Sequence, residues 1–216
     1  MQETLLKAIT QKYPLKKIDV KEFASLKING MTFKISAYDA QGFGRVSVME
    51  AKGFFGLVKT DAVILSPVYT DLPLYSLDRM SFFGKSAVIV ELYDTLEKSF
   101  DERALISCKE KYSYLKDRDH KERWYDDIKF KSSFSKSYGK KQKSAVNGLI
   151  AEHFNAYVNA LTGKTDDVLK KKKKIEDYVN GLLRNGGPST DVFVKAIGKE
   201  KTETLYKKVL FGTEEF

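Results

Sequence analysis

The first 95 residues alternate between apolar and polar positions, and this two-residue period constrains the fold more than any other feature of the chain. The stretch "FASLKINGMTFKISAYDA" contains two alternating runs joined by Asn29-Gly30, the strongest short-range signal for a β-hairpin. "GRVSVMEAKG", "FGLVKTDAVIL" and "SAVIVELYDT" have the composition of further strands, separated by Gly53, Gly56 and Gly84. The pattern predicts a meandering antiparallel sheet with about six or seven strands before residue 95.

After residue 95 the pattern changes to the longer period of amphipathic helices. Ser99 followed by Glu102 has the spacing of a capping box and predicts a helix that extends to about Lys116. Residues 165–183 and a last region divided by Gly198 are expected to form further helices. The clearest helical pattern is an apolar face formed by Val146, Leu149, Ile150, His153, Phe154, Tyr157, Val158 and Leu161.

The order of these elements predicts an α+β fold. Residues 2–12 form a short amphipathic pattern before the sheet, and "WYDDIKFKSSFSKS" has the alternation of one more strand between the helices. Strands followed by helices are typical of a sheet covered by helices. We therefore expect a three-layer α/β/α sandwich, with an antiparallel sheet of about six or seven strands between helices, in one domain that spans residues 1–216.

Composition and charge limit the classes of function. The apolar fraction of 42% is enough for a core, and the chain has no apolar run of the roughly 18 residues that a membrane span requires. The single cysteine, Cys108, excludes an intrachain disulfide, and with an N-terminus unlike a signal peptide it favours the cytoplasm. Residues 101–216 carry 25 Lys and Arg against 18 Asp and Glu, so +7 of the net +9. Such a basic half suits nucleic acid, anionic lipid, an acidic protein or a ligand with carboxylates.

Several common catalytic and binding motifs are missing from the sequence. It contains no glycine-rich nucleotide motif, no G-x-S-x-G and no H-E-x-x-H, and two histidines cannot form a histidine-rich metal site. His120 lies in the polar stretch "KDRDHKER", which is typical of a solvated loop. His153 lies on the apolar helix face, where it is either a hydrogen-bonded core residue or part of a pocket. The five lysines 170–174 cover all sides of a helix, so some of them are expected to point inward or to snorkel. The run is either a solvated face or a docking site for an acidic partner.

Acidic residues interrupt the apolar runs near "SPVYTDLPLYSLDRM", which holds two of the four prolines. Glu50, Asp61 and Asp78 each interrupt or end an apolar run. One interpretation is that they are solvated at strand ends and in loops. The other is that an apolar pocket encloses a carboxyl, because burial raises its pKa toward neutrality and allows it to donate a proton.

Three stretches in a fixed order resemble the ferredoxin-dependent bilin reductases. "LSPVYTDLPLYSLDRM" followed by "SAVIVELYDT" is similar to a strand, a proline-containing loop and a second strand of that family. "ERWYDDIKFKSSFSKS" resembles a family segment in which a tryptophan precedes a strand that ends in a basic residue. "FVKAIGKEKTETLYKKVLF" is similar to the closing helices of the family, and the resemblance extends over residues 45–216. It implies a sheet between helices, with the bilin held between the sheet and the C-terminal helices.

The resemblance also implies roles for individual residues. Asp78 matches the central aspartate that donates protons to the pyrrole rings, and Asp61 falls at or beside a histidine-or-asparagine position of the family. Glu50 lies near a position where some members have a catalytic glutamate, and Lys136 matches a basic residue that can hold a propionate. Tyr75 and His153 are the further substrate contacts that we expect.

The resemblance has gaps as well. Some members of the family carry a second aspartate in the loop before the last helices, where this chain has Gly186 and Gly187, and Asp191 comes several residues later. Gly212 stands where the family has its final aspartate. These departures bear on which double bond of the substrate would be reduced.

The resemblance implies ferredoxin-dependent reduction of biliverdin or a close relative by a radical mechanism. We expect no bound cofactor, electrons from an acidic ferredoxin or flavodoxin, a monomer, and neither membrane nor nucleic acid as a partner. The first alternative is a non-catalytic bilin- or haem-binding protein on the same fold. The second is a basic module that docks on nucleic acid or on a protein partner.

Overall fold

An antiparallel sheet forms the centre of the structure, a computed structural model that describes residues 2–119, 121–160, 163–187 and 189–215. Its strands are β1 (Leu15–Ile18), β2 (Ser25–Ile28), β3 (Met31–Ala40), β4 (Gly44–Gly53), β5 (Val58–Pro67), β6 (Leu74–Phe82), β7 (Lys85–Tyr93) and β8 (Phe134–Tyr138). They are ordered β1-β3-β4-β5-β6-β7-β8, and β2 pairs with β3 beside β1. The predicted antiparallel meander is therefore confirmed, with seven strands before residue 95.

The β2–β3 turn has the conformation that its sequence predicts. Asn29 and Gly30 both have positive φ angles, 48° and 75°, as both central residues of a type I′ turn require. The turn sets the register, with Ile28 opposite Met31. Since every following strand pairs antiparallel with its predecessor, this register decides which side chains face each side of the sheet.

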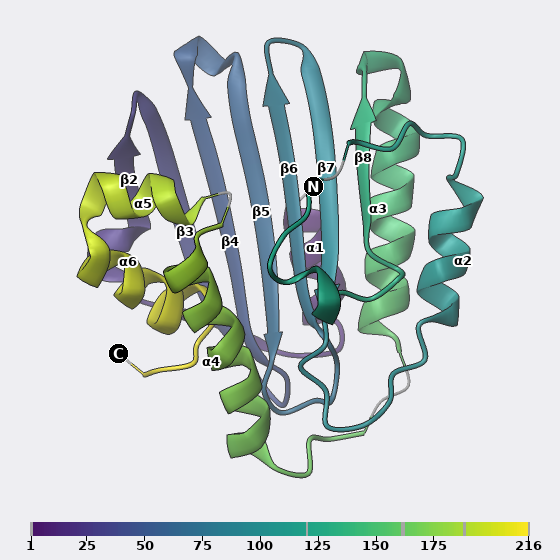
Figure 1. Ribbon diagram of the computed structural model, residues 1–216, viewed down its shortest axis with the longest axis vertical. Coiled ribbons are helices and arrows are strands. Elements are labelled where there is room, and N and C mark those ends of the chain that lie inside the picture. Colours follow the sequence, from purple (N-terminus) through teal and green to yellow (C-terminus); the bar gives the residue numbers. More distant parts are fainter. Residues whose placement is uncertain (1, 120, 161–162, 188, 216) are drawn as a thin grey trace.

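Two layers of helices cover the two faces of the sheet, as predicted for an α/β/α sandwich. The first layer contains α1 (Gln2–Thr10), α2 (Arg103–Lys111) and α3 (Lys143–Val158). The second contains α4 (Val168–Asn185), α5 (Thr190–Ile197), α6 (Lys199–Thr204) and the π-helix η5 (Leu205–Leu210). Each layer shares one apolar cluster with the sheet, so we call the two sides the α1–α3 face and the α4–η5 face. Figure 1 shows α4, α5 and α6 in front of the sheet and α1 behind it.

Most helix predictions agree with the structure, and one start signal was wrong. The predicted apolar face of α3 is buried from Val146 to Val158, while Leu161 lies outside the described residues. The helix expected over residues 99–116 is shorter, Arg103–Lys111, and Asp101 Oδ1 accepts a hydrogen bond at 3.1 Å from the backbone N–H of its first residue, Arg103. The carboxylate of Glu102 instead accepts a hydrogen bond from the backbone N–H of Ser132 at 2.8 Å, so the expected capping box does not form.

Buried polar contacts attach the C-terminal layer to the sheet. Ser47 Oγ on β4 donates a hydrogen bond to the carbonyl of Leu210 at 2.9 Å. The buried guanidinium of Arg45 donates to the carbonyls of Val209 and Lys208. These carbonyls are at the C-terminal end of η5, where a helix leaves acceptors without partners of its own. Among the described residues, no helix is long and apolar enough to cross a bilayer.

Candidate functional site

Asp78 occupies the middle of β6 and projects to the α4–η5 face. It lies opposite Ala62 of β5 and Ile89 of β7, which project to the same face because paired residues share a side. Leu77 and Arg79, one position away, project to the α1–α3 face. Asp78 is thus the one predicted site residue under the C-terminal helices, where the resemblance places the bilin.

The surroundings of Asp78 favour its protonated form. Its side chain is half-buried, and burial raises its pKa from 3.8 to about 6, with a further increase from the negative charge of Glu91. A long hydrogen bond from Ser76 Oγ, at 3.5 Å, opposes this shift. A carboxyl with a pKa of about 6 holds a proton on about a tenth of the molecules at pH 7, roughly a hundred times more than an ordinary aspartate, and this makes it a candidate general acid.

Glu91 is a second acid on this face, and it was not among the residues predicted from the sequence. It pairs with Ser76, so it is the diagonal neighbour of Asp78 across two strands. Its carboxylate accepts a hydrogen bond from Tyr93 Oη at 2.6 Å, and Lys129 Nζ lies 3.5 Å away. The signal was present in "SAVIVELYDT", where an acid interrupts an apolar strand just as Asp61 does.

Tyrosine side chains from the sheet and from the helical layer pack together on the same face as Asp78. We call them the tyrosine layer: Tyr93 of β7, Tyr125 before β8, Tyr178 of α4 and Tyr206 of η5. Ring centroids lie 4.4 Å apart for Tyr93 and Tyr178 and 5.4 Å apart for Tyr93 and Tyr125. Burial raises the pKa of Tyr125 to about 12 and that of Tyr206 above its usual range, and the charge of Asp78 adds to both shifts. These phenols are therefore neutral and can donate hydrogen bonds.

Asp61 and Glu50 lie on the opposite face of the sheet from Asp78. They pair with each other across β4 and β5, and Asp61 also pairs with Arg79. Asp61 Oδ2 is 2.6 Å from Arg79 Nη2, and Arg79 also contacts Asn147 of α3 at 3.5 Å. Glu50 forms an ion pair of 2.6 Å with Lys52. The structure does not bring these two acids together with Asp78. Side chains alternate between the two faces along a strand, and the positions of Glu50 in β4 and Asp61 in β5 project to the face opposite Asp78.

Lys136, Tyr75 and His153 also lie on the α1–α3 face. Lys136 is buried opposite Val88, and its Nζ binds the carbonyl of Leu115 at 3.0 Å and Asp117 at 2.8 Å. Tyr75 Oη lies 3.5 Å from Nδ1 of His153.

His153 itself is fully buried, with Nε2 3.1 Å from the carbonyl of Ser132. Burial lowers the pKa of His153 to about 4, so it is a neutral core histidine, the first of the two interpretations given above. His120 lies outside the described residues.

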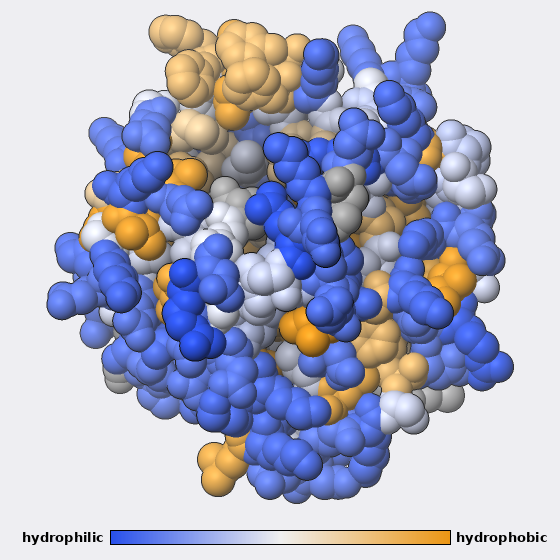
Figure 2. Space-filling view, in the orientation of Figure 1, coloured by the Kyte–Doolittle hydropathy of each residue, from blue (hydrophilic) through white to orange (hydrophobic). Residues whose placement is uncertain are grey.

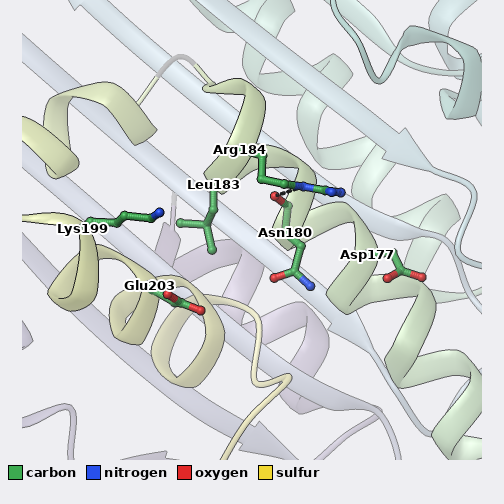
Figure 3. A pocket seen from close by; sticks show the side chains of 6 residues that line it. All are labelled: Asp177, Asn180, Leu183, Arg184, Lys199 and Glu203. Carbon is green, nitrogen blue, oxygen red and sulfur yellow. Dashed lines mark hydrogen bonds between the residues drawn. The ribbon is translucent and has the colours of Figure 1, made fainter.

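A hollow of about 630 Å³ opens between α4 and α6. Asp177, Asn180, Leu183 and Arg184 of α4 line it together with Lys199 and Glu203 of α6. Figure 3 shows these side chains on the two helices that cover the sheet. The lining is mostly charged and offers two cations, Arg184 and Lys199. Neither this hollow nor a second one beside β1 and β3 is lined by Asp78.

The described residues contain no cluster of three or more His, Cys, Asp or Glu side chains that could hold a metal ion. The carboxyls of Asp78 and Glu91 form a pair only, and Glu91 already interacts with Tyr93 and Lys129. The chemistry that this face offers is therefore proton transfer and hydrogen bonding by carboxyl and phenol groups.

Comparisons with known proteins show the fold. No protein-family model matches the chain, and no curated protein sequence matches it. Among solved structures it is similar to phytochromobilin synthase from tomato in complex with biliverdin, with a TM-score of 0.81. The match covers 98% of this chain and 82% of the tomato chain at 11% sequence identity. The fold expected from the sequence is therefore shared with this tomato protein.

Proposed function

We propose that this protein reduces a linear tetrapyrrole, biliverdin or a close relative, with electrons from reduced ferredoxin or flavodoxin. The observation that carries the proposal is Asp78, a half-buried carboxyl with its pKa raised to about 6 beneath the C-terminal helices. Support comes from the similarity in fold to an enzyme that was crystallised with biliverdin. A raised pKa on a sheet face lined by aromatic side chains is what proton donation to an apolar, planar substrate requires.

In this reaction the protein supplies protons and the external donor supplies electrons. Reduction of one double bond consumes two electrons and two protons, and each electron added to the conjugated pigment makes it more basic. Asp78 gives a proton to the resulting radical and regains one from solvent. The hydrogen bond from Tyr93 Oη holds the carboxylate of Glu91 in place, and the negative charge of Glu91 favours the protonated form of Asp78. Asp78 is the one proton donor identified here, and the reaction needs two protons. In this proposal the second proton comes from solvent or from the tyrosine layer.

The remaining parts of the substrate need an apolar surface and cations. In this proposal the tyrosine layer contacts the pyrrole rings, and Arg184 and Lys199 at the hollow between α4 and α6 bind the propionates. Lys136 does not have this role, because Leu115 and Asp117 occupy its Nζ on the other face. The excess of +7 in residues 101–216 would speed the encounter with an acidic electron donor.

A second candidate is a protein that binds a bilin or haem without reducing it. The observation in its favour is that β4 and β5 contribute Met49, Ala51, Ala62 and Ile64 to the α4–η5 face, and no acid or histidine. Asp78 would then have only Glu91 as an acidic neighbour. The same face can hold a flat pigment in either case, so the two functions differ in turnover and not in binding.

The deciding experiment is anaerobic incubation with biliverdin and reduced ferredoxin, followed by chromatography of the pigment. A reduced bilin with the wild type is the expected result. Replacement of Asp78 by Asn should leave the biliverdin absorption shift intact and lower turnover by at least about 100-fold, the usual contribution of a general acid. Asp61→Asn is the matched control, because it makes the same change on the other face and should keep turnover.

Each outcome decides between the candidates. Binding with no reduced product, even under strongly reducing conditions, would support the non-catalytic binder. Unchanged turnover in Asp78→Asn would remove Asp78 from the reaction. Loss of turnover in Asp61→Asn with retained folding would show that the α1–α3 face takes part.

A further inference from the structure

Two neighbouring hairpins end in exposed aromatic side chains, independently of the function proposed above. Phe54, Phe55 and Leu57 lie in the β4–β5 turn, and Phe82 and Phe83 lie at the β6–β7 turn. Each of these five side chains, which we call the apolar tip, is more than half exposed. Figure 1 shows both turns at the same end of the sheet, and Figure 2 shows hydrophobic side chains gathered there at the upper left. Contiguous apolar surface of this kind marks an interaction site.

The backbone holds these aromatic residues outward at a cost in conformation. Phe54, Phe55 and Phe83 have φ angles of 50°, 56° and 46°, in the left-handed region that bulky residues rarely adopt. Asn or Gly would fit the same turns without this cost. The two turns are also joined, because the backbone N–H of Phe83 donates a hydrogen bond to the carbonyl of Leu57 at 3.1 Å. The apolar tip is therefore one surface built by two hairpins.

Lysine side chains surround the apolar tip. Lys52 and Lys59 lie directly opposite each other on β4 and β5, immediately before the β4–β5 turn, and Lys85 lies opposite Phe82. All three are exposed, and we call them the lysine rim. Like charges opposite each other destabilise a sheet. Glu50 forms an ion pair of 2.6 Å with Lys52 and offsets part of that repulsion, and an anionic surface that covers the tip would offset the rest.

We propose that the apolar tip and the lysine rim dock on an anionic lipid surface. Aromatic rings are favoured at the boundary between lipid headgroups and acyl chains, and adjacent lysines bind anionic headgroups while their alkyl stems contact apolar surface. A second copy of this chain is a poorer occupant, because it would bring two lysine rims together. This proposal departs from the expectation, given above from the sequence, that no membrane is a partner. The contact is peripheral, so it needs no helix that crosses the bilayer.

The test is co-sedimentation of the full chain with vesicles of phosphatidylcholine alone or with about 30% phosphatidylserine. The tip variant is Phe55→Asn with Phe83→Asn, since Asn tolerates the left-handed backbone. Its control is Leu169→Asn, because Leu169 is 79% exposed in the first turn of α4. Figure 1 shows the start of α4 at the lower end of the sheet, away from both turns. The rim variant is Lys59→Gln with Lys85→Gln, and its control is Lys16→Gln with Lys17→Gln on β1, which removes the same charge.

We expect the wild type to bind the anionic vesicles and not the neutral ones. The tip variant should lose at least about tenfold in partitioning, as should the rim variant, while both controls bind like the wild type. Failure of the wild type to sediment with anionic vesicles would overturn the proposal, as would full binding by the tip variant. Analytical ultracentrifugation of the same samples covers self-association: a dimer that only the tip variant abolishes would identify a second copy as the occupant and refute the lipid contact.

Discussion

The carboxyl of Asp78 is destabilising when ionised, and its removal should stabilise the protein at neutral pH. Its pKa is about 6 in the folded protein and 3.8 as an ordinary value, so the folded state binds more protons between these two pH values. The free energy of unfolding therefore falls as pH rises from about 4 to about 6. Above this window the protein keeps the whole loss of stability that ionised Asp78 causes. The shift corresponds to at most about 3 kcal/mol, because 1 pKa unit equals about 1.4 kcal/mol.

Asp78→Asn should raise the free energy of unfolding by about 1–3 kcal/mol at pH 7.5 and leave it nearly unchanged at pH 3.5. Urea denaturation at the two pH values measures this difference. Asp61→Asn is a control of opposite sign: it leaves the guanidinium of Arg79 without its 2.6 Å partner and should destabilise the protein by about 1–3 kcal/mol at pH 7.5. Equal loss of stability in both variants at pH 7.5 would contradict the assignment of Asp78 to an apolar environment.

The same two aspartates show what the sequence could and could not predict about the site. Both interrupt apolar strands, and in the structure burial raises the pKa of Asp78. The pattern could not assign a face, because a shift of one residue in strand pairing moves a side chain to the other side of the sheet. Asp61 lies opposite Arg79 and not Asp78, so the two acids are separated by the sheet itself.

At the scale of elements, the lysine run of α4 has a structural role at one position. Lys171 is fully buried, with Nζ 2.6 Å from the carbonyl of Leu72 and 3.3 Å from Asp71 Oδ1. Asp71 also accepts hydrogen bonds from the backbone N–H groups of Glu97 and Lys98, each at 3.0 Å. This pair joins α4 to the proline-containing loop before β6 and to the segment after β7. The loop that looked like a candidate site is thus held by a buried ion pair.

Replacement of Lys171 by Met should destabilise the protein by about 2–4 kcal/mol, because Asp71 stays buried without its cation. Lys170→Met removes the same charge from the exposed neighbour and should change the free energy of unfolding by less than about 0.5 kcal/mol. Thermal and chemical denaturation at pH 7 compare the two. A cost of similar size for both variants would show that the run acts through total charge.

Elements with strong local signals were predictable, and those fixed by distant contacts were not. The Asn29-Gly30 turn and the apolar face of α3 depend on residues near in sequence. At the start of α2, Glu102 accepts a hydrogen bond from the backbone N–H of Ser132, thirty positions later, and no local pattern contains that contact. The sequence predicted that some lysine of the run would point inward, but it did not identify Lys171. The partner of Lys171 is Asp71, which is 100 positions away in the sequence.

For the whole molecule, the two helical layers differ in how they contact the sheet. The α1–α3 face is an apolar cluster around Val63, Leu77 and Phe154. The α4–η5 face contains the tyrosine layer, Asp78 and Glu91, and its last helices follow glycines with positive φ at residues 186 and 198. A π-helix closes this layer, and such helices are frequent at functional sites. The layer with more buried polar groups and glycine boundaries is the one expected to move.

A flat pigment beside Asp78 would have to displace tyrosine side chains, so its binding should be visible in the C-terminal layer. Tyr206 Oη lies 3.1 Å from both Ser189 Oγ and Thr190 Oγ1. A shift of the Tyr206 ring would therefore disturb these hydrogen bonds at the start of α5. Hydrogen exchange followed by mass spectrometry should show faster exchange in residues 190–210 than in α3 without pigment, and slower exchange in residues 190–210 once biliverdin is added.

The α1–α3 layer is the internal control for this measurement, because the sheet separates it from Asp78. Its exchange should stay unchanged with biliverdin, and so should the pattern of the wild type with an unrelated anionic dye of similar size. Protection that appeared in α3 and left residues 190–210 unaffected would place the pigment on the face of Asp61, Lys136 and His153. The predicted roles of those three residues would then stand, and Asp78 would be a buried acid without a substrate.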